Sequence, residues 1–380
     1  MSSRTAITAG VVTITTADRR KYWHHWCRYA SLFGLDPYLS NVPALECDSI
    51  VCAYGARVRT GLYGRGAQVK VQTVTDALSA ISQTIQLAGY PSPLYRTDQK
   101  QYNLTIERMV EGFRREDPPS IPQLAVPITV PNACFEASYQ QENPRIQTAG
   151  SLIMIAFYYL LRVGEYTKPR MVTRGGKKVR ATRTKQFTYN NVGFFKNGKV
   201  IPRKSPLSLL LTCDSATLKI TNQKNGRMGE TIHQQTTGSP NCPIRALALR
   251  INHINENNGA SDDRLLCDYF DNGDWHSLQS TDIITLIRTT AKVLKLDEQG
   301  IHPDLIGAHS LRAGGAMALR LHSFEDTIIM KMGRWTSLTF LQYIHTQIAH
   351  LSADISKKMS IPLPFLNIAS IESTPDNTQR

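Results

Sequence analysis

Three short segments in the second half of the chain carry side chains that could do chemistry. They contain Arg162 and Glu165, His309 and Arg312, and Trp335 and Tyr343. An Arg side chain holds oxyanions with a planar, permanently charged fork. A His can hydrogen-bond an anion or accept a proton near neutral pH, and a Tyr hydroxyl can act as a covalent nucleophile. These segments are therefore the candidates for a reactive site.

Each segment taken alone also fits an ordinary structural role. Arg162 ends an apolar run, where a cation meets the negative end of a helix dipole favourably. His309 and Arg312 are neighbours one helical turn apart, a spacing that is common by chance. Tyr343 lies between Leu341 and Ile344 and fits an aromatic residue of the core. Only the combination of the three segments, in this order, indicates a function.

In this order the segments resemble the tyrosine recombinase (phage integrase) family. Leu160-Leu161-Arg162-Val163-Gly164-Glu165 matches the first arginine box of that family, and His309-Ser310-Leu311-Arg312 matches the second. Gly333-Arg334-Trp335 followed by Tyr343 matches the third. The Ser-Leu-Arg-Ala-Gly-Gly and Gly-Arg-Trp-x-Ser motifs most resemble those of recombinases from Crypton-like or DIRS-like mobile elements.

The family also has a catalytic lysine on a β-hairpin between the two arginine boxes. The segment from Leu218 to Gly226 resembles that hairpin, with Lys224 beside an Asn-Gly turn. Lys219 is the rival position. The two lysines are five residues apart, so in a regular strand one of them points away from the site.

The resemblance implies a division of roles. Tyr343 would attack a DNA phosphate, while Arg162 and Arg312 hold its non-bridging oxygens. His309 would bind phosphate or take the tyrosine proton, and the lysine would protonate the leaving 5′ oxygen. Trp335 stands where many members have His, and its indole N–H can only donate a hydrogen bond. Glu165 is expected to orient a catalytic side chain; no metal and no cofactor are implied.

The charge of the chain is concentrated in one segment. The 380 residues include 44 Lys and Arg against 30 Asp and Glu, a formal net charge of +14, and residues 126–250 alone carry 19 basic and 5 acidic side chains. Between 168 and 185 lie eight basic residues and no acid: Lys168, Arg170, Arg174, Lys177, Lys178, Arg180, Arg183 and Lys185. Such a cluster is typical of phosphate contacts with nucleic acid, although a solvated basic loop or a nuclear-targeting signal has the same composition.

Apolar periodicity predicts a mainly α protein with a small β-sheet. We expect helices over 17–33, 71–87, 103–115, 148–163, 244–253, 282–294, 313–321, 326–331 and 338–351. Short strands are expected over 187–189, 192–195, 207–212, 216–221 and 230–233. Five prolines between 118 and 131 predict a linker. The expected domains are a helical core-binding domain (1–117), that linker (118–131), an α+β catalytic domain (132–365) and a flexible tail (366–380).

Near the start of the chain, aromatic and cationic residues alternate. Tyr22, Trp23, His24, His25, Trp26 and Arg28 could follow a DNA strand, or they could pack in a helix bundle. Packing is the favoured interpretation for most of them.

Composition excludes several classes of protein. The longest apolar run, Leu152 to Leu161, is about half the length of a membrane span, and no signal peptide is recognisable. Seven widely spaced cysteines indicate reduced thiols in an intracellular protein, nuclear if its source is eukaryotic. The expected partners are double-stranded DNA and further copies of the chain, as a dimer or tetramer on DNA, with no membrane and no small-molecule substrate.

The leading hypothesis is a site-specific DNA recombinase that works through a 3′-phosphotyrosine intermediate, for integration or excision of a mobile element. Two alternatives remain open. One is an enzyme of the type IB topoisomerase or telomere-resolvase kind, and the other is a catalytically silent, transposon-derived DNA-binding protein.

Overall fold

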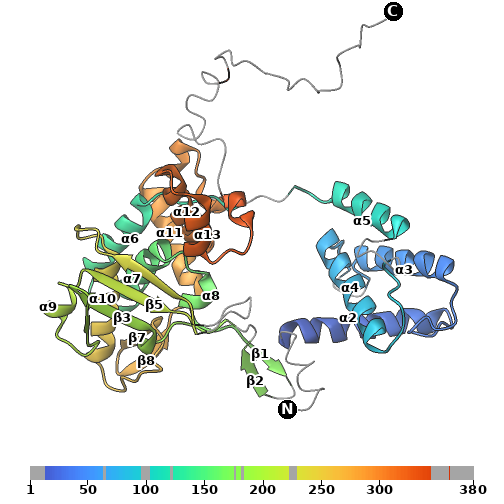
Figure 1. Cartoon of the computed structure of the whole chain (residues 1–380), viewed down its shortest axis with the longest axis horizontal. Helices are drawn as coiled ribbons and strands as arrows, with labels where there is room; N and C mark the ends of the chain where they lie inside the picture. Colours follow the sequence, from blue (N-terminus) through green and yellow to red (C-terminus); the bar gives the residue numbers. More distant parts are fainter. Residues whose placement is uncertain are drawn as a thin grey trace, which may run out of the picture.

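The computed structural model describes residues 13–62, 66–95, 103–119, 123–174, 177–180, 184–221, 229–343 and 359. In Figure 1 the helices α2 to α5 form one group and the remaining elements form another, joined by the chain between α5 and α6. Each group has a hydrophobic core of its own among the described residues. No helix within these ranges is both long and apolar enough to cross a membrane.

Within its described residues, the first group has helices and connecting turns but no β-sheet. Its elements are α2 (Thr13–Leu32), α3 (Ala44–Arg59), α4 (Val71–Leu87) and α5 (Leu104–Glu116). Helix α4 buries Val74, Leu78, Ile81 and Ile85, which recur at the three- and four-residue spacing of one helix face. Each such side chain contributes about 1.5–3 kcal/mol when it is fully buried, so this face holds the bundle together.

The second group is built around one apolar helix, α7 (Pro144–Tyr158). Asn143 accepts a hydrogen bond from Ile146 N (3.1 Å) and Pro144 occupies the first turn, a combination that starts a helix. The helices of this group besides α7 are α6 (Thr129–Tyr139), α8 (Val163–Tyr166), α9 (Leu207–Leu210), α10 (Pro243–Asn255), α11 (Ser280–Val293), α12 (Ser310–Leu321) and α13 (Asp326–Gly333). All residues of α7 from Thr148 to Phe157 are buried, so α7 is the centre of the core.

A small antiparallel sheet covers part of this core. It consists of β3 (Val192–Lys196), β4 (Lys199–Ile201), β5 (Ser215–Lys219) and β6 (Thr231–Gln235), in the order β4-β3-β5-β6 within the described residues. Asn197 and Gly198 both have positive φ (49° and 73°) at the turn between β3 and β4, as a tight hairpin requires. Two further hairpins pair β1 (Met171–Arg174) with β2 (Lys177–Arg180) and β7 (Asp268–Asp271) with β8 (Asp274–Ser277).

The predicted fold class, mainly α with a small β-sheet, is confirmed. The helix expected over 71–87 has those bounds in the structure, and strands occur near 192–195, 216–221 and 230–233. The strand expected over 207–212 is wrong, because Leu207–Leu210 is a short helix that begins after Pro206. Pro206 has an extended backbone and a fixed φ, and such a residue commonly precedes a helical turn.

Several elements were not predicted from the sequence. They include α3, α6, α8, β4, and the hairpins β1–β2 and β7–β8. Helix α6 starts at Thr129, inside the range expected to be a linker, and Pro131 is accommodated in its first turn. Just before α6, Leu124 N bonds to Leu305 O (3.0 Å) and Val126 N to Ser310 O (3.3 Å). The proline-rich chain from Leu124 onward therefore packs on the second group.

Candidate active site

The turn after α7 brings the three sequence segments together. Leu160 has a positive φ (47°) and turns the chain out of the helix, and its carbonyl oxygen is the common acceptor of two guanidinium groups. Arg312 donates to it from Nη1, and Arg334 donates from Nη2 at 3.0 Å. One backbone oxygen thus joins the first, second and third boxes.

Glu165 is the second centre of the site. Its side chain is only 2% exposed, and its carboxylate accepts two hydrogen bonds from Arg334, at 2.9 Å and 3.0 Å. The same carboxylate accepts from the main-chain N of Arg162 (2.8 Å) and lies 3.4 Å from Arg162 Nη1. The bidentate contact between Arg334 and Glu165 is the strongest geometry for an Arg–carboxylate pair. These contacts place Glu165 against both Arg162 and Arg334, and its role in orienting a catalytic side chain stays a prediction.

Arg312 is buried, with 2% of its surface exposed. Its two terminal nitrogens donate to the carbonyl oxygens of Leu160 and Gly333, and its guanidinium carbon lies 4.2 Å from the centroid of the Trp335 ring. A cation over an indole face is attracted by the ring electrons. The resemblance implies that Arg312 holds a non-bridging phosphate oxygen; here both of its terminal nitrogens make a main-chain contact, and a guanidinium has five N–H donors in all.

Arg162 and His309 are more accessible than Arg312. The Arg162 side chain is 21% exposed at the start of α8. His309 is exposed directly before α12, at its N-cap position and one turn before Arg312, and its main-chain N donates to Gln123 Oε1 (3.1 Å). These two side chains are therefore placed where a ligand arriving from solvent would meet them.

Trp335 is held by the end of α13. Arg334 adopts the left-handed conformation (φ 57°) as the helix ends, and Trp335 N bonds to Met330 O (2.9 Å). The Trp335 ring covers Gly333 so closely that a Cβ there would lie 1.7 Å from it. The ring also contacts Phe340, with centroids 5.6 Å apart. The glycine of this box is thus required by the tryptophan that follows it.

Tyr343 lies at the end of η4 (Leu338–Tyr343), a 3₁₀ helix where we expected a longer α-helix. Phe340 anchors η4, because it is completely buried in a cluster with Leu160, Ala316 and Ile329. That cluster includes residues of α12 and of the turn after α7. Tyr343 therefore follows, by three positions, the buried Phe340, whose cluster joins all three boxes. Its side chain lies outside the described part of the structure.

The predicted hairpin between the arginine boxes is formed by β5 and β6. Tyr159 donates to Ala216 O (3.0 Å) and Gln234 donates to Tyr158 O (2.6 Å), so the sheet is tied to the end of α7. Lys219 is exposed at the end of β5 opposite Thr231. Lys224 lies outside the described residues, and the choice between the two lysines stays open.

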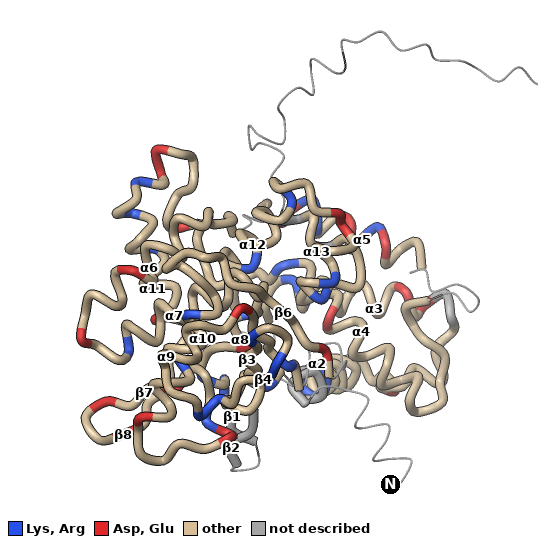
Figure 2. Tube along the Cα trace, turned by 60° about the vertical axis from the view of Figure 1, so that its left-hand side comes forward, with Lys and Arg blue, Asp and Glu red and all other residues tan. Residues whose placement is uncertain are grey.

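The basic segment includes the hairpin β1–β2. Lys168, Arg170 and Lys185 are exposed, and Figure 2 shows blue Lys or Arg positions near the labels of β1 and β4. Arg174, Lys177, Lys178 and Arg180 lie in the hairpin, where only the main chain is described, and Arg183 lies outside the described residues. Figure 2 also shows a second group of basic residues between α12 and α13.

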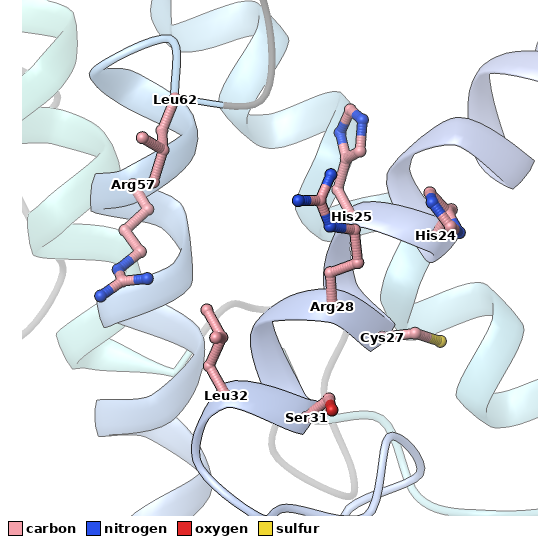
Figure 3. A pocket seen from close by; sticks show the side chains of 8 residues that line it. All are labelled: His24, His25, Cys27, Arg28, Ser31, Leu32, Arg57 and Leu62. Atoms are coloured by element: carbon pink, nitrogen blue, oxygen red, sulfur yellow. The ribbon is translucent and has the colours of Figure 1, made fainter.

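In the first group of helices the aromatic and cationic residues separate. Trp26 is completely buried, where its ring packs at 5.2 Å from that of Tyr54, whereas His24 and Arg28 are exposed. A pocket of about 780 Å³ lies on this side (Figure 3), lined by His24, His25, Cys27, Arg28, Ser31, Leu32, Arg57 and Leu62. Burial, followed by the charge of Lys21, lowers the pKa of His25, and Arg28 and Arg57 bring permanent positive charge to the pocket. The preference for packing was thus correct for Trp26.

One residue of this site had no predicted role, namely Arg334. It is 6% exposed and contacts both Glu165 and Leu160. The sequence holds a hint, since an Arg directly before Trp335 occupies the place where a helix usually ends in Gly. Pairing across 169 positions cannot be read from such a pattern.

No family model matches the chain, and no curated protein matches it. Solved structures that resemble it include two recombinases and a transposon integrase. One is the XerH site-specific recombinase bound to a palindromic difH substrate, a post-cleavage complex, with a TM-score of 0.46 and 15% identity over 84% of this chain and 74% of that chain. Another is the Tn1549 transposon integrase with a circular-intermediate DNA, at 0.41 and 12% over 82% and 85%. XerA recombinase gives 0.38 and 12% over 90% and 92%. At these identities the likeness concerns the fold alone.

Proposed function

We propose that this chain is a site-specific DNA recombinase that cuts and rejoins duplex DNA through a 3′-phosphotyrosine intermediate. The observation that carries the proposal is the convergence of Arg162, Arg312 and Arg334 on Leu160 and Glu165, directly beside the segment that ends in Tyr343. Glu165 forms ion pairs with both Arg162 and Arg334. One carboxylate thus meets two guanidinium groups, so this part of the site carries net positive charge. A cationic site next to a tyrosine suits attack on a phosphodiester.

The reaction forms one bond and breaks another of the same kind. The Tyr343 oxygen would attack phosphorus in line, the P–O5′ bond would break, and the 5′ oxygen would leave with a proton. Energy is conserved in the phosphotyrosine linkage, so a 5′-hydroxyl from another strand can reverse the step and rejoin the DNA. No hydrolysis and no external energy source are needed.

The surrounding side chains supply charge and protons. The ordinary pKa of a tyrosine is about 10, so its proton must be removed as it attacks; the exposed His309 is the residue proposed to accept it. Arg162 would bind a non-bridging oxygen, and Arg312 would supply positive charge from behind Trp335. Lys219 or Lys224 would protonate the leaving oxygen.

DNA would contact both groups of helices. The basic segment around β1–β2 would bind phosphates beside the active site, and Arg28 and Arg57 at the pocket of Figure 3 would bind phosphates from the other group. We also propose a dimer or tetramer on DNA, since exchange of strands requires one nucleophile for each strand cut. We also propose that the recombination integrates or excises a mobile element.

A nicked suicide substrate tests the chemistry. Binding sites are first selected from a random duplex pool, and each is then nicked near the candidate cleavage position so that the short cleaved strand diffuses away and religation fails. We expect wild-type protein to become trapped on DNA, and Tyr343→Phe to form no adduct. Tyr90→Phe, which alters an exposed tyrosine in the first group, is the matched control and should be trapped as efficiently as wild type.

The outcomes separate the alternatives. Undiminished trapping in Tyr343→Phe would remove Tyr343 from the mechanism. DNA binding with no adduct under any condition would support a silent DNA-binding protein. Relaxation of supercoiled DNA without a paired site would favour an enzyme of the topoisomerase kind.

A further inference from the structure

We propose that Arg334 is a positioning residue, which holds Arg162 and the segment leading to Tyr343 in one fixed arrangement through its buried contact with Glu165. The inference rests on the proposed function. It starts from the fact that Arg334 is buried although its side chain is charged, and that its φ of 57° lies where glycine is favoured. Strain of this kind is retained where surrounding contacts require it.

The contacts of Arg334 explain what is held. Its two terminal nitrogens bind both oxygens of Glu165, and one of them also binds Leu160 O. Its Nε is buried and has no hydrogen-bond partner among the described residues. Such a donor adds to the cost of burial, so stability alone does not account for an arginine here.

Glu165, held by Arg334, in turn positions Arg162. Two of its contacts reach Arg162, one at the main-chain N (2.8 Å) and one at Nη1 (3.4 Å). Without Arg334, the carboxylate of Glu165 would lose its bidentate contact and keep its contacts with Arg162. The Glu165 carboxylate could then move, and the Arg162 side chain that it contacts would no longer be fixed in one position.

On the other side, Arg334 precedes Trp335 in the chain. Trp335 stacks on Arg312 at 4.2 Å and contacts Phe340 of η4. The main chain at 334 therefore fixes the ring that covers Arg312 and the start of the segment that ends in Tyr343. A single ion pair between α8 and the end of α13 sets the position of the nucleophile segment relative to Arg162.

The test compares Arg334→Gly with Arg334→Lys and Glu165→Gln. Glycine accepts the positive φ but removes the charge, and lysine keeps the charge without the two-pronged contact. In single-turnover cleavage of the suicide substrate at saturating protein, we expect Arg334→Gly to lower the rate by about 100-fold, as misplacement of a catalytic group by 1 Å can do. We expect Arg334→Lys to lower it by about 10-fold, and the dissociation constant for DNA to change little in any of the three.

The matched control is Arg320→Ala. Arg320 forms an exposed ion pair with Asp326 (3.2 Å) between α12 and α13, so its removal should leave the cleavage rate unchanged. The double variant of Arg334→Gly with Glu165→Gln should be no slower than the slower single variant, because both remove the same pair. A cleavage rate of Arg334→Gly or Arg334→Lys equal to wild type, or fully additive effects in the double variant, would overturn the proposal.

Hydrogen–deuterium exchange gives an answer that does not depend on activity. We expect Arg334→Lys to raise exchange in both 160–166 and 333–340, while Arg320→Ala changes neither. If wild type forms no adduct, the proposed function fails, yet coupled exchange of these two segments would still support the link. Unchanged exchange in both segments would refute it.

Discussion

The Leu160 carbonyl shows how single residues shape this site. A left-handed Leu costs roughly 1–2 kcal/mol relative to an ordinary conformation, and the turn that it makes aims one oxygen at both Arg312 and Arg334. Backbone oxygens carry partial negative charge, so they can hold guanidinium groups in place without neutralising them. The site thereby keeps positive charge for an anionic ligand.

A second residue, His253, gives a pH dependence to folding. Its Nε2 accepts a hydrogen bond from Phe270 N (2.9 Å), and burial, with a smaller contribution from Arg250, lowers its pKa from 6.5 to about 4. The unfolded chain therefore takes up this proton more readily than the folded chain. Stability that is fully present above pH 6.5 should be lost as the pH falls toward 4.

We expect the free energy of unfolding, measured by urea denaturation between pH 7 and pH 4.5, to decrease with falling pH. His253→Gln keeps an acceptor for Phe270 N but does not titrate, so its curve should be flatter than that of wild type. His302→Gln, at an exposed histidine, is the control and should follow wild type. Parallel curves for His253→Gln and wild type would show that His253 does not carry this dependence.

Among the elements, α12 depends on two glycines for its position. A Cβ at Gly314 would lie 2.1 Å from Val126 O, and one at Gly315 would lie 2.4 Å from Phe157 O. The helix therefore packs directly on main chain from α7 and from the segment before α6. This close approach brings Arg312 within reach of Leu160 O.

Gly314→Ala should therefore destabilise the protein by about 1–3 kcal/mol, since the main chain has no room to yield. Gly112→Ala is the matched control, because Gly112 lies within α5 and has nothing within 4 Å of its added Cβ. That change should be neutral or stabilising by up to about 1 kcal/mol. Thermal and urea unfolding measure both effects; equal stability of the two variants would contradict the close packing of α12.

At the scale of the whole molecule, positive charge lies on both groups of helices. Arg28 is exposed at the pocket of the first group, and Arg170 is exposed beside β1 in the second. The hydrophobic cores of the two groups are separate. A duplex bound by both groups would thus contact two parts of the chain that have separate hydrophobic cores.

Salt dependence of DNA binding tests this arrangement. A variant that no longer neutralises one DNA phosphate should have a slope of log K against log salt that is smaller by about 0.9. We expect this reduction for Arg28→Ala and for Arg170→Ala, and the sum of the two for their double variant, if both residues bind one duplex. Lys295→Ala, which removes an exposed lysine paired with Glu298, should leave the slope unchanged. A wild-type slope in either single variant would exclude that residue from the DNA interface.

Local pattern determined a large part of this protein. The apolar periodicity of residues 71–87 predicted helix α4, because burial of one face follows directly from sequence spacing. The apolar stretch within 148–163 predicted a helix that largely coincides with α7, which is buried throughout from Thr148 to Phe157. The order of Arg162, Arg312 and Trp335 predicted a candidate site, and the structure brings the three boxes together around Leu160 and Glu165. The turns Asn197-Gly198 and Asn272-Gly273, both with positive φ, also signal hairpins, and β7–β8 was missed although its signal is present.

Tertiary structure alone decided which partner each charged side chain has. Sequence spacing predicts neighbours three or four residues apart, as for Arg162 and Glu165, but the pair of Glu165 and Arg334 spans 169 positions. That pair exists because α12 packs closely on α7 and carries the end of α13 with it. The sequence by itself therefore determined the residue types of the site and most of its helices, while packing decided that Arg334 is buried and that Arg312 binds main chain. The physical reason is that burial and ion pairing depend on distances in space, which local spacing does not contain.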